Sequence, residues 1–420
     1  MRIIAAIHVV LFHYGLGLVH QSTDQYIAAT RHSAAPLHWT AYILGHGITN
    51  IIAAGSWSVS LFFILSGFIL FYNYGDDREN SLDAKKFWIA RFARIYPVYL
   101  VGILVMAPFL FHRWAVDPRF TTHKIVTGGV LSLAMLQSWF PRHYATLFNG
   151  PGWSMSVEAF CYALFPLLLL PLRRVARSSA LIAVIAVCWI IAMVKGPIIW
   201  ICIRNWWVSN GGPDNPAAIG AITDYTPLFR LPEFIAGMAL GRLMLLRGGP
   251  AIRGARLSFL TLGAVAASLF FASLGSHCPW FLAASGGMIP LFLIVIWTLT
   301  VDESFLARLL AWSPLVFLGE ASYAVYILHE PIDHWGGTLV NRITHHPVTR
   351  TMFDIPNYWV LMLYLAVVLG VCSLVYRYFE MPARDRIRRE LNRRSQPQPA
   401  ASSVVPQLDP PFEISDPVTP

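Results

Sequence analysis

Residues 56–74 read SWSVSLFFILSGFILFYNY, a stretch that contains no charged side chain. A helix needs about 20 apolar residues to cross the hydrocarbon core of a bilayer, so this stretch predicts a membrane-spanning helix. The whole chain has the same character, because 56% of its 420 residues are hydrophobic, 13% are charged and the mean hydropathy is +0.55. A water-soluble globule could not cover that much apolar surface, which indicates a protein embedded in a membrane.

Further apolar runs of similar length recur along the chain and predict an all-α integral membrane protein, with about ten transmembrane helices in one bundle. The predicted spans cover residues 3–20, 56–74, 92–111, 153–171, 179–202, 228–246, 257–276, 280–300, 312–330 and 358–379. The first run could be a cleaved secretory signal, but the many spans that follow favour an uncleaved first helix.

Basic loops set the predicted orientation, because cytoplasmic loops collect Lys and Arg. The loops at 75–91, 172–178 and 247–256 are rich in these residues, which predicts that all three are cytoplasmic. The first two can share a side only if the chain between them crosses the membrane an even number of times. The shorter apolar run at 125–139 is therefore predicted to be an extra interfacial or re-entrant segment, and both termini are predicted to be cytoplasmic.

Residues 1–390 form the predicted transmembrane domain, and residues 391–420 form a predicted disordered tail rich in Pro and Ser. Much of the net charge of +9 lies in the basic loops and directly after the last span. That charge can attract anionic membrane lipids, and it does not indicate a nucleic-acid site. No internal repeat is present, so the inverted-repeat signature of many secondary transporters is missing. The oligomeric state cannot be read from these patterns.

The first span carries two ionisable residues on one face. Arg2 and His13 are eleven residues apart, which is almost three whole helical turns, or about 16 Å along the axis. An ionisable group at membrane depth is expensive unless it faces a protein interior or a wet cavity, and it is often functional. His13 is therefore either a catalytic candidate or a structural histidine bonded to a neighbouring carbonyl. His8 lies off that face and is interpreted as structural.

A second candidate group opens the span at 153–171. Ser154 and Glu158 are spaced i, i+4 and share one face, predicted to lie in the outer half of the membrane with Trp153 at the interface. A lone glutamate at that depth indicates function, through His13 or through a substrate, and an ion pair with an arginine is the structural alternative.

A polar stripe at helical spacing is predicted at the outer end of the span 312–330. Its members are Ser322, Tyr326, His329 and Glu330. His329 could be an interfacial hydrogen-bonding residue. Arg230 and Glu233, spaced i, i+3, are expected to neutralise each other. The His-rich loop 334–346 lacks a zinc-like spacing with Cys or acidic partners, so no metal site is expected.

These residues fall within motifs that resemble the membrane-bound acyltransferases of family three, the O-acetyltransferases of bacterial polysaccharides and related glycans. Arg2 and His13, with ten residues between them, match the motif that opens the family. The other matching stretches are GSWSVSLFFILSGFIL (55–70), RFARIYPVYL (91–100), GPGWSMSVEAFCYALFPLL (150–168), RLPEFIAGMALG (230–241), LGEASYAVYILHEPI (318–332) and YRYFEMPARDR (376–386). Family members usually carry several residues before the arginine, whereas Met1 precedes it here. The chain resembles the stand-alone form, without a fused SGNH-type domain.

The resemblance implies a bacterial inner-membrane enzyme that transfers an acyl group, most simply acetyl, from cytosolic acyl-CoA to a hydroxyl of a glycan or lipid-linked glycan. Acyl-CoA is then a donor substrate, and no permanently bound cofactor is expected. Arg91 and Arg94 match the family's donor-binding RxxR motif, and positive-inside anchoring is their structural alternative. The expected catalytic residues are His13, Glu158 and Arg2, and the expected substrate-binding residues are Trp153, Ser154, Tyr326 and His329.

Acyl transfer also agrees with the chemistry of these side chains. Moving an acyl group from a thioester to a hydroxyl requires a base, hydrogen-bond donors for the developing oxyanion, and cations for the CoA phosphates. Histidine suits the first role because its ordinary pKa lies near working pH, so His13 is the candidate base. The rival class is a multi-span transporter of a sugar or similar solute, and a structural or lipid-binding membrane protein is a third. Neither rival needs a CoA site.

Overall fold

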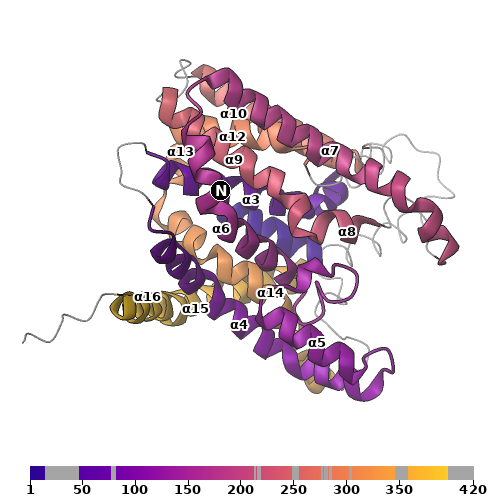
Figure 1. The fold of residues 1–420 in the computed structure, drawn as a ribbon. Coiled ribbons are helices and arrows are strands. Elements are labelled where there is room, and N and C mark those ends of the chain that lie inside the picture. The colour runs from indigo at the N-terminus through magenta and orange to yellow at the C-terminus, as the bar shows by residue number, and fades with distance from the viewer. Residues whose placement is uncertain are drawn as a thin grey trace, which may run out of the picture.

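The computed structural model describes residues 1–14, 47–76, 82–211, 214, 219–247, 255–275, 278, 282, 286–301, 305–345 and 358–395. Every regular element within these ranges is a helix (Figure 1). This confirms the all-α class, and lipid favours it because a helix satisfies its backbone hydrogen bonds internally. The predictions for residues 15–20 of the first span, for part of the span 280–300 and for the tail from 396 onward fall outside the described residues.

The chain begins with a helix at Arg2–Tyr14, called here the N-terminal helix. The next α-helices are α3 (Trp57–Tyr74), α4 (Ala84–Val116), α5 (Thr122–Leu133), α6 (Gly152–Arg173), α7 (Ser178–Ser209), α8 (Gly220–Tyr225) and α9 (Pro227–Arg247). They are followed by α10 (Ala255–Ser273), α12 (Ile289–Val301), α13 (Phe305–Leu310), α14 (Ser313–Thr344), α15 (Tyr358–Val375) and α16 (Met381–Ser395). Short helical turns are η1 (Ala54–Ser56), η2 (Gln137–Trp139) and the π-helical η6 (Tyr376–Glu380).

Six helical segments among the described residues are long and apolar enough to cross a membrane. They are Gly47–Tyr74, Ala84–Val116, Gly152–Arg173, Ser178–Ser209, Arg256–Ser273 and Trp359–Leu391. The N-terminal helix and Ile289–Thr300 are apolar but shorter. In contrast, α9 and α14 carry ionisable side chains that neighbouring helices cover, among them Glu233 and His329, each 0% exposed. The membrane-protein character is confirmed, and the larger number of about ten crossings stays a prediction.

The predicted extra segment at 125–139 contains α5, which has 12 residues. Such a helix is about 18 Å long, shorter than the hydrocarbon core of about 30 Å. The turn η2 that follows it is held inside the bundle, where Gln137 donates to the carbonyl of Gly152 at 2.9 Å and Ser138 donates to the carbonyl of Trp153 at 2.6 Å. The start of α6 is therefore tied to η2, and the position of α5 relative to the membrane stays a prediction.

Helix α14 extends beyond the span predicted at 312–330 and ends at Thr344. The indole of Trp335 donates to the carbonyl of Val105 on α4 at 3.1 Å, so tertiary contacts continue the helix past Pro331. The polar stripe around Tyr326 consequently lies in the middle of α14, and its position at the outer end of a membrane span stays a prediction. Helix α16 similarly extends five residues into the tail predicted at 391–420, because it ends at Ser395.

The basic loops gather at one end of the bundle. The Arg173 guanidinium at the end of α6 donates to the carbonyl of Tyr74 at the end of α3. Arg247 at the end of α9 donates to the hydroxyl of Ser178 at 2.7 Å. Figure 1 shows α16 near this end and α5 and α8 near the opposite one. The loops predicted to share a side of the membrane therefore share an end of the molecule, and which side that is stays a prediction.

Small residues allow α3 and α9 to cross closely. A Cβ atom on Gly67 would overlap the carbonyl oxygen of Phe234, and one on Gly237 would overlap the carbonyl oxygen of Ile64. Gly67 follows Ser66 on α3, and such small residues permit close helix approach in membranes. The crossing brings the buried polar face of α9 against α3.

Candidate active site

A cavity opens between the N-terminal helix, α3, α4, α6 and α14, and it encloses about 560 Å³ of empty space, its open mouth included. Its apolar wall includes Phe62, Phe63 and Ile95. Its polar lining contains Arg2, Arg94, Ser154, Glu158, Ser322, Tyr323 and Tyr326. Five of the predicted site residues, drawn from four separate helices, therefore meet in one space.

Arg2 and Arg94 bring two positive charges to this cavity. Helix α4 starts at Ala84 because Asp83 caps it, with the Asp83 carboxylate accepting the backbone N–H of Lys86 at 3.0 Å. That hydrogen bond holds the pKa of Asp83 below its usual range. The cap places Arg94 almost three turns into the helix. Within the described residues, neither guanidinium has a hydrogen bond or an ion pair, although Glu158 interacts electrostatically with Arg2 and Glu380 with Arg94. Both guanidiniums therefore retain N–H donors for an anionic ligand.

Arg91 shares a face of α4 with Arg94, as predicted, but it has different surroundings. Its guanidinium carbon lies 5.5 Å from the centroid of the Phe87 ring and 5.9 Å from that of Tyr162. Its Nε atom is buried without a hydrogen-bond partner, and Arg91 is not among the cavity-lining residues. The two arginines of the predicted RxxR motif are therefore not equivalent.

The carboxylate of Glu158 accepts hydrogen bonds from the hydroxyls of Tyr162 and, at 3.3 Å, Ser66. Sequence reasoning did not select Tyr162 as a site residue, although its i, i+4 spacing from Glu158 was a usable signal. Within the described residues, Glu158 makes no hydrogen bond to His13. The predicted cytoplasmic N-terminus implies that Arg2 lies at the cytoplasmic surface, whereas Glu158 was predicted in the outer half of the membrane. Because both line one cavity, these two depths cannot both be correct.

Trp153 is buried among neighbouring side chains, with 8% of its surface exposed, and its predicted depth at the membrane interface stays a prediction. Its ring lies 4.7 Å from that of Tyr225, and the guanidinium carbon of Arg230 lies 5.5 Å from its centroid. The cause of this burial is η2, which covers the first turn of α6 and keeps it inside the bundle. Trp153 also packs on Phe63 with ring centroids 6.4 Å apart, so it supports the cavity wall from behind.

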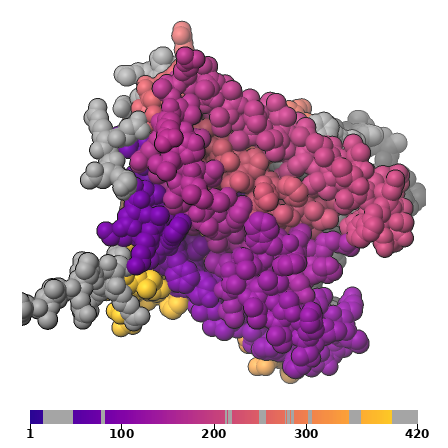
Figure 2. Space-filling model, viewed as in Figure 1, coloured from indigo at the N-terminus to yellow at the C-terminus, as the bar shows by residue number. Residues whose placement is uncertain are grey.

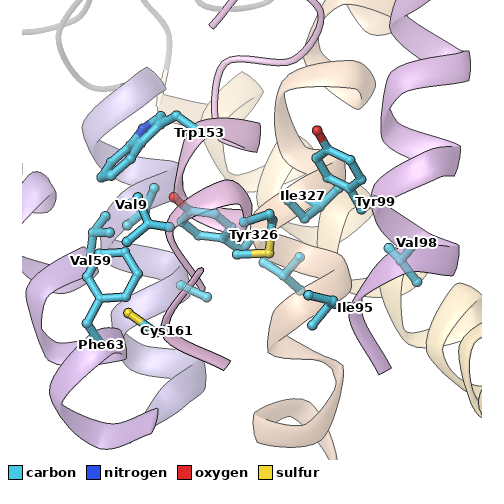
Figure 3. Packing of buried hydrophobic residues seen from close by; sticks show 14 of the residues in the cluster. Val9, Val59, Phe63, Ile95, Val98, Tyr99, Trp153, Cys161, Tyr326 and Ile327 are labelled. Carbon is cyan, nitrogen blue, oxygen red and sulfur yellow. The ribbon is translucent and has the colours of Figure 1, made fainter. Parts of the chain in front are cut away.

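His13 and His329 form a pair of perpendicular rings whose centroids are 5.0 Å apart. Neither is among the cavity-lining residues, but the ring of Tyr326, which does line the cavity, is 6.3 Å from that of His329. Figure 3 shows Tyr326 at the centre of the buried cluster, between Val9 and Phe63 on one side and Ile95 on the other. The base candidate is therefore close to a residue of the cavity wall, and along the N-terminal helix it is about 16 Å from Arg2.

His8 is structural, as predicted. Its Nε2 lies 2.7 Å from the carbonyl oxygen of Ile51 and its Nδ1 lies 2.9 Å from the hydroxyl of Ser58. A carbonyl only accepts, so Nε2 carries the hydrogen and Nδ1 accepts from Ser58. Both nitrogens are satisfied, and the side chain joins the N-terminal helix to α3 and the segment before it.

The expected pairing of Arg230 with Glu233 is confirmed, with Nη1 and Oε1 2.9 Å apart and both side chains buried. Ser60 on α3 also accepts a hydrogen bond from Arg230 at 3.1 Å, and the Asp224 carbonyl accepts one at 2.7 Å. In the part of the chain that the structure describes, no three His, Cys, Asp or Glu side chains gather as a metal site would require. His346 of the predicted His-rich loop lies outside that part.

A protein-family model described as an acyltransferase domain matches residues 1–377. The chain belongs to this acyltransferase family. It is 28% identical over 371 residues to Acyltransferase MdmB of Streptomyces mycarofaciens, covering 86% of this chain and 89% of that protein. It is 26% identical over 349 residues to Peptidoglycan O-acetyltransferase OatA of Listeria monocytogenes, covering 78% of this chain and 51% of that protein.

A third relative, Putative peptidoglycan O-acetyltransferase YrhL of Bacillus subtilis, is 26% identical over 371 residues, covering 82% of this chain and 53% of the relative. The acyltransferase thus spans about half the length of these two peptidoglycan O-acetyltransferases. No solved structure matches it. The family confirms the recognition made from the motifs and makes the chain an enzyme of the acyl-transfer class. The transporter alternative finds no support in these comparisons.

Proposed function

We propose that this acyltransferase transfers an acetyl group from cytosolic acetyl-CoA to a hydroxyl of a carbohydrate or other envelope acceptor, in the bacterial inner membrane with both termini in the cytoplasm. The observation that carries the proposal is the cavity in which the guanidiniums of Arg2 and Arg94 retain N–H donors. The O-acetyltransferase names of two relatives support acetyl as the group and a cell-envelope hydroxyl as the acceptor.

The cavity suits the anionic part of an acyl-CoA. A guanidinium binds phosphate through paired, charge-assisted hydrogen bonds, and Arg2 and Arg94 both have free donors. The single carboxylate in the lining, Glu158, is already engaged by two hydroxyls, which reduces its ability to neutralise the arginines. The basic loops, which share one end of the bundle, add positive potential that attracts a polyanionic donor to that face of the molecule.

The chemical step is assigned to His13, close to a residue of the cavity wall. In CoA the pantetheine arm separates the phosphates from the thioester, so the phosphate site and the base must lie apart, as Arg2 and His13 do by about 16 Å along one helix. His13 takes the proton of the acceptor hydroxyl, and the hydroxyl oxygen attacks the thioester carbonyl carbon. The carbon–sulfur bond then breaks, and the proton passes to the CoA sulfur. Tyr326 lines the cavity, and its hydroxyl is the candidate donor to the developing oxyanion.

The test uses membranes that contain the acyltransferase, supplied with acetyl-CoA labelled in the acetyl group. Release of CoA thiol and transfer of label to an alkali-labile ester in the membrane fraction are measured together. The variant His13→Ala is expected to lose about 10²-fold to 10⁴-fold in transfer, because a general base contributes that much, and to bind acetyl-CoA as the unaltered protein does. Full transfer by folded His13→Ala at equal expression would refute the proposal, as would sugar uptake by sealed vesicles without acetyl-CoA.

A further inference from the structure

The hydrogen bonding of His329 defines which of its nitrogens carries a proton. Its Nδ1 lies 2.8 Å from the carbonyl oxygen of Tyr326, one turn earlier on α14. A carbonyl oxygen only accepts, so Nδ1 is the donor, and in a neutral imidazole Nε2 is left with a lone pair. The side chain is 0% exposed, and within the described residues this Nε2 has no hydrogen-bond partner. A buried acceptor without a partner is expensive and calls for an explanation.

His13 is the aromatic neighbour that could supply the missing donor. The two rings are perpendicular, with centroids 5.0 Å apart. The carbonyl of His329 already accepts from the hydroxyl of Tyr364 at 2.8 Å, so both the backbone and the Nδ1 side of this histidine are fixed. His8 provides a contrast on the N-terminal helix, because both of its nitrogens are bonded.

We propose that His329 is a positioning residue for His13, accepting through Nε2 a hydrogen bond from one ring N–H of His13. That bond fixes the tautomer of His13 and leaves its other nitrogen free to take the proton of the acceptor hydroxyl. Such a bond is long in the unliganded enzyme and tightens when substrates bind, as catalytic hydrogen bonds commonly do. The assignment rests on the proposed function, in which His13 is the base.

The proton balance involves only one titrating histidine. The acceptor hydroxyl gives its proton to the free nitrogen of His13, and the resulting imidazolium keeps its other N–H directed at the lone pair of His329. The imidazolium then gives a proton to the sulfur that leaves the broken thioester bond. His329 remains neutral throughout, so its effect is to orient the base and to stabilise its charged form, the role that the third member plays in a catalytic triad.

The experiment compares two replacements of His329 in the full-length protein. His329→Gln retains an oxygen that can accept from His13, whereas His329→Met fills similar space without a strong acceptor. His329→Met is expected to lower kcat for acetyl transfer about 10²-fold and to leave KM for acetyl-CoA within about twofold, because only the base is affected. His329→Gln is expected to recover kcat to within about tenfold of the unaltered enzyme.

His334 on the same helix supplies the matched control. Its Nδ1 donates to the carbonyl of Glu330 at 3.1 Å, as that of His329 does to Tyr326, but its ring packs on Phe109. His334→Gln is therefore expected to leave both kinetic constants unchanged. Equal losses in His329→Gln and His329→Met, or a raised KM with normal kcat, would overturn the proposal.

A double variant separates this proposal from the proposed function. Since His329 acts through His13, adding His329→Met to His13→Ala is expected to produce no further loss of the residual transfer rate. A further hundredfold loss would show that His329 acts independently and would overturn the positioning role. Full activity of His13→Ala would instead refute the proposed function, in which His13 is the general base. If His13→Ala is inactive and His329→Met is fully active, only the positioning role of His329 is refuted.

Discussion

The difference between Arg94 and Arg91 makes the donor site testable at the level of single side chains. Replacing Arg94 by Gln removes one guanidinium from the cavity and leaves a polar side chain. A hydrogen bond to a charged group contributes about 1.5–3 kcal/mol. Since about 1.4 kcal/mol corresponds to tenfold in Kd, Arg94→Gln is expected to weaken acetyl-CoA binding about 10-fold to 100-fold. Arg91→Gln is expected to change Kd by less than about threefold, because Arg91 faces the rings of Phe87 and Tyr162.

The assay is isothermal titration of acetyl-CoA into protein held in lipid nanodiscs, at two salt concentrations. Arg94→Gln is expected to reduce the salt dependence of Kd as well, because one screened charge contact has been removed. The control is Arg113→Gln near the far end of α4, where the guanidinium carbon lies 4.7 Å from the centroid of the Phe120 ring and outside the cavity lining. Unchanged binding by Arg94→Gln, or equal weakening by all three variants, would refute the assignment of the cavity as the donor site.

Three further predictions address the N-terminal helix, the packing of α3 and the orientation. Inserting one alanine between Val10 and Leu11 is expected to abolish acetyl transfer, although both Arg2 and His13 are still present. The insertion turns His13 by about 100° relative to Arg2 around the helix axis. An insertion variant that still transfers acetyl would contradict the proposal that the two residues must share one face. Gly67→Ala is expected to destabilise the detergent-solubilised protein by about 1–3 kcal/mol in thermal unfolding, whereas Gly263→Ala, whose Cβ would meet nothing within 4 Å, should not. Reporters placed within residues 75–90 and after Arg394 are expected to be cytoplasmic. A reporter within residues 346–355, beyond the end of α14, is expected to be external. If the first two reporters lie on opposite sides of the membrane, the predicted even number of crossings between them is wrong.

The helices were accessible to sequence reasoning because an apolar run of sufficient length is a local property. The span predicted at 228–246 agrees closely with α9, and that at 257–276 with α10. The end of α14 was not accessible, since its continuation past Pro331 depends on contacts such as that of Trp335 with α4. Likewise, the burial of Trp153 depends on its contact with η2. Ser138 of η2 donates a hydrogen bond to the Trp153 carbonyl, and helical spacing within α6 cannot predict this contact with a separate segment.

For the candidate site, the amino-acid sequence by itself determined that Arg2 and His13 share a helical face and that Arg230 and Glu233 can pair, because both follow from spacing within one helix. Only the tertiary structure decided that Arg94 faces a cavity while Arg91 lies among aromatic rings, and that His329 rather than Glu158 is next to His13. The physical reason is that helical spacing defines a direction around one axis, whereas the partner found in that direction is contributed by helices distant in the chain. Which charged groups remain unpaired is therefore decided by how α4, α6 and α14 pack around the N-terminal helix.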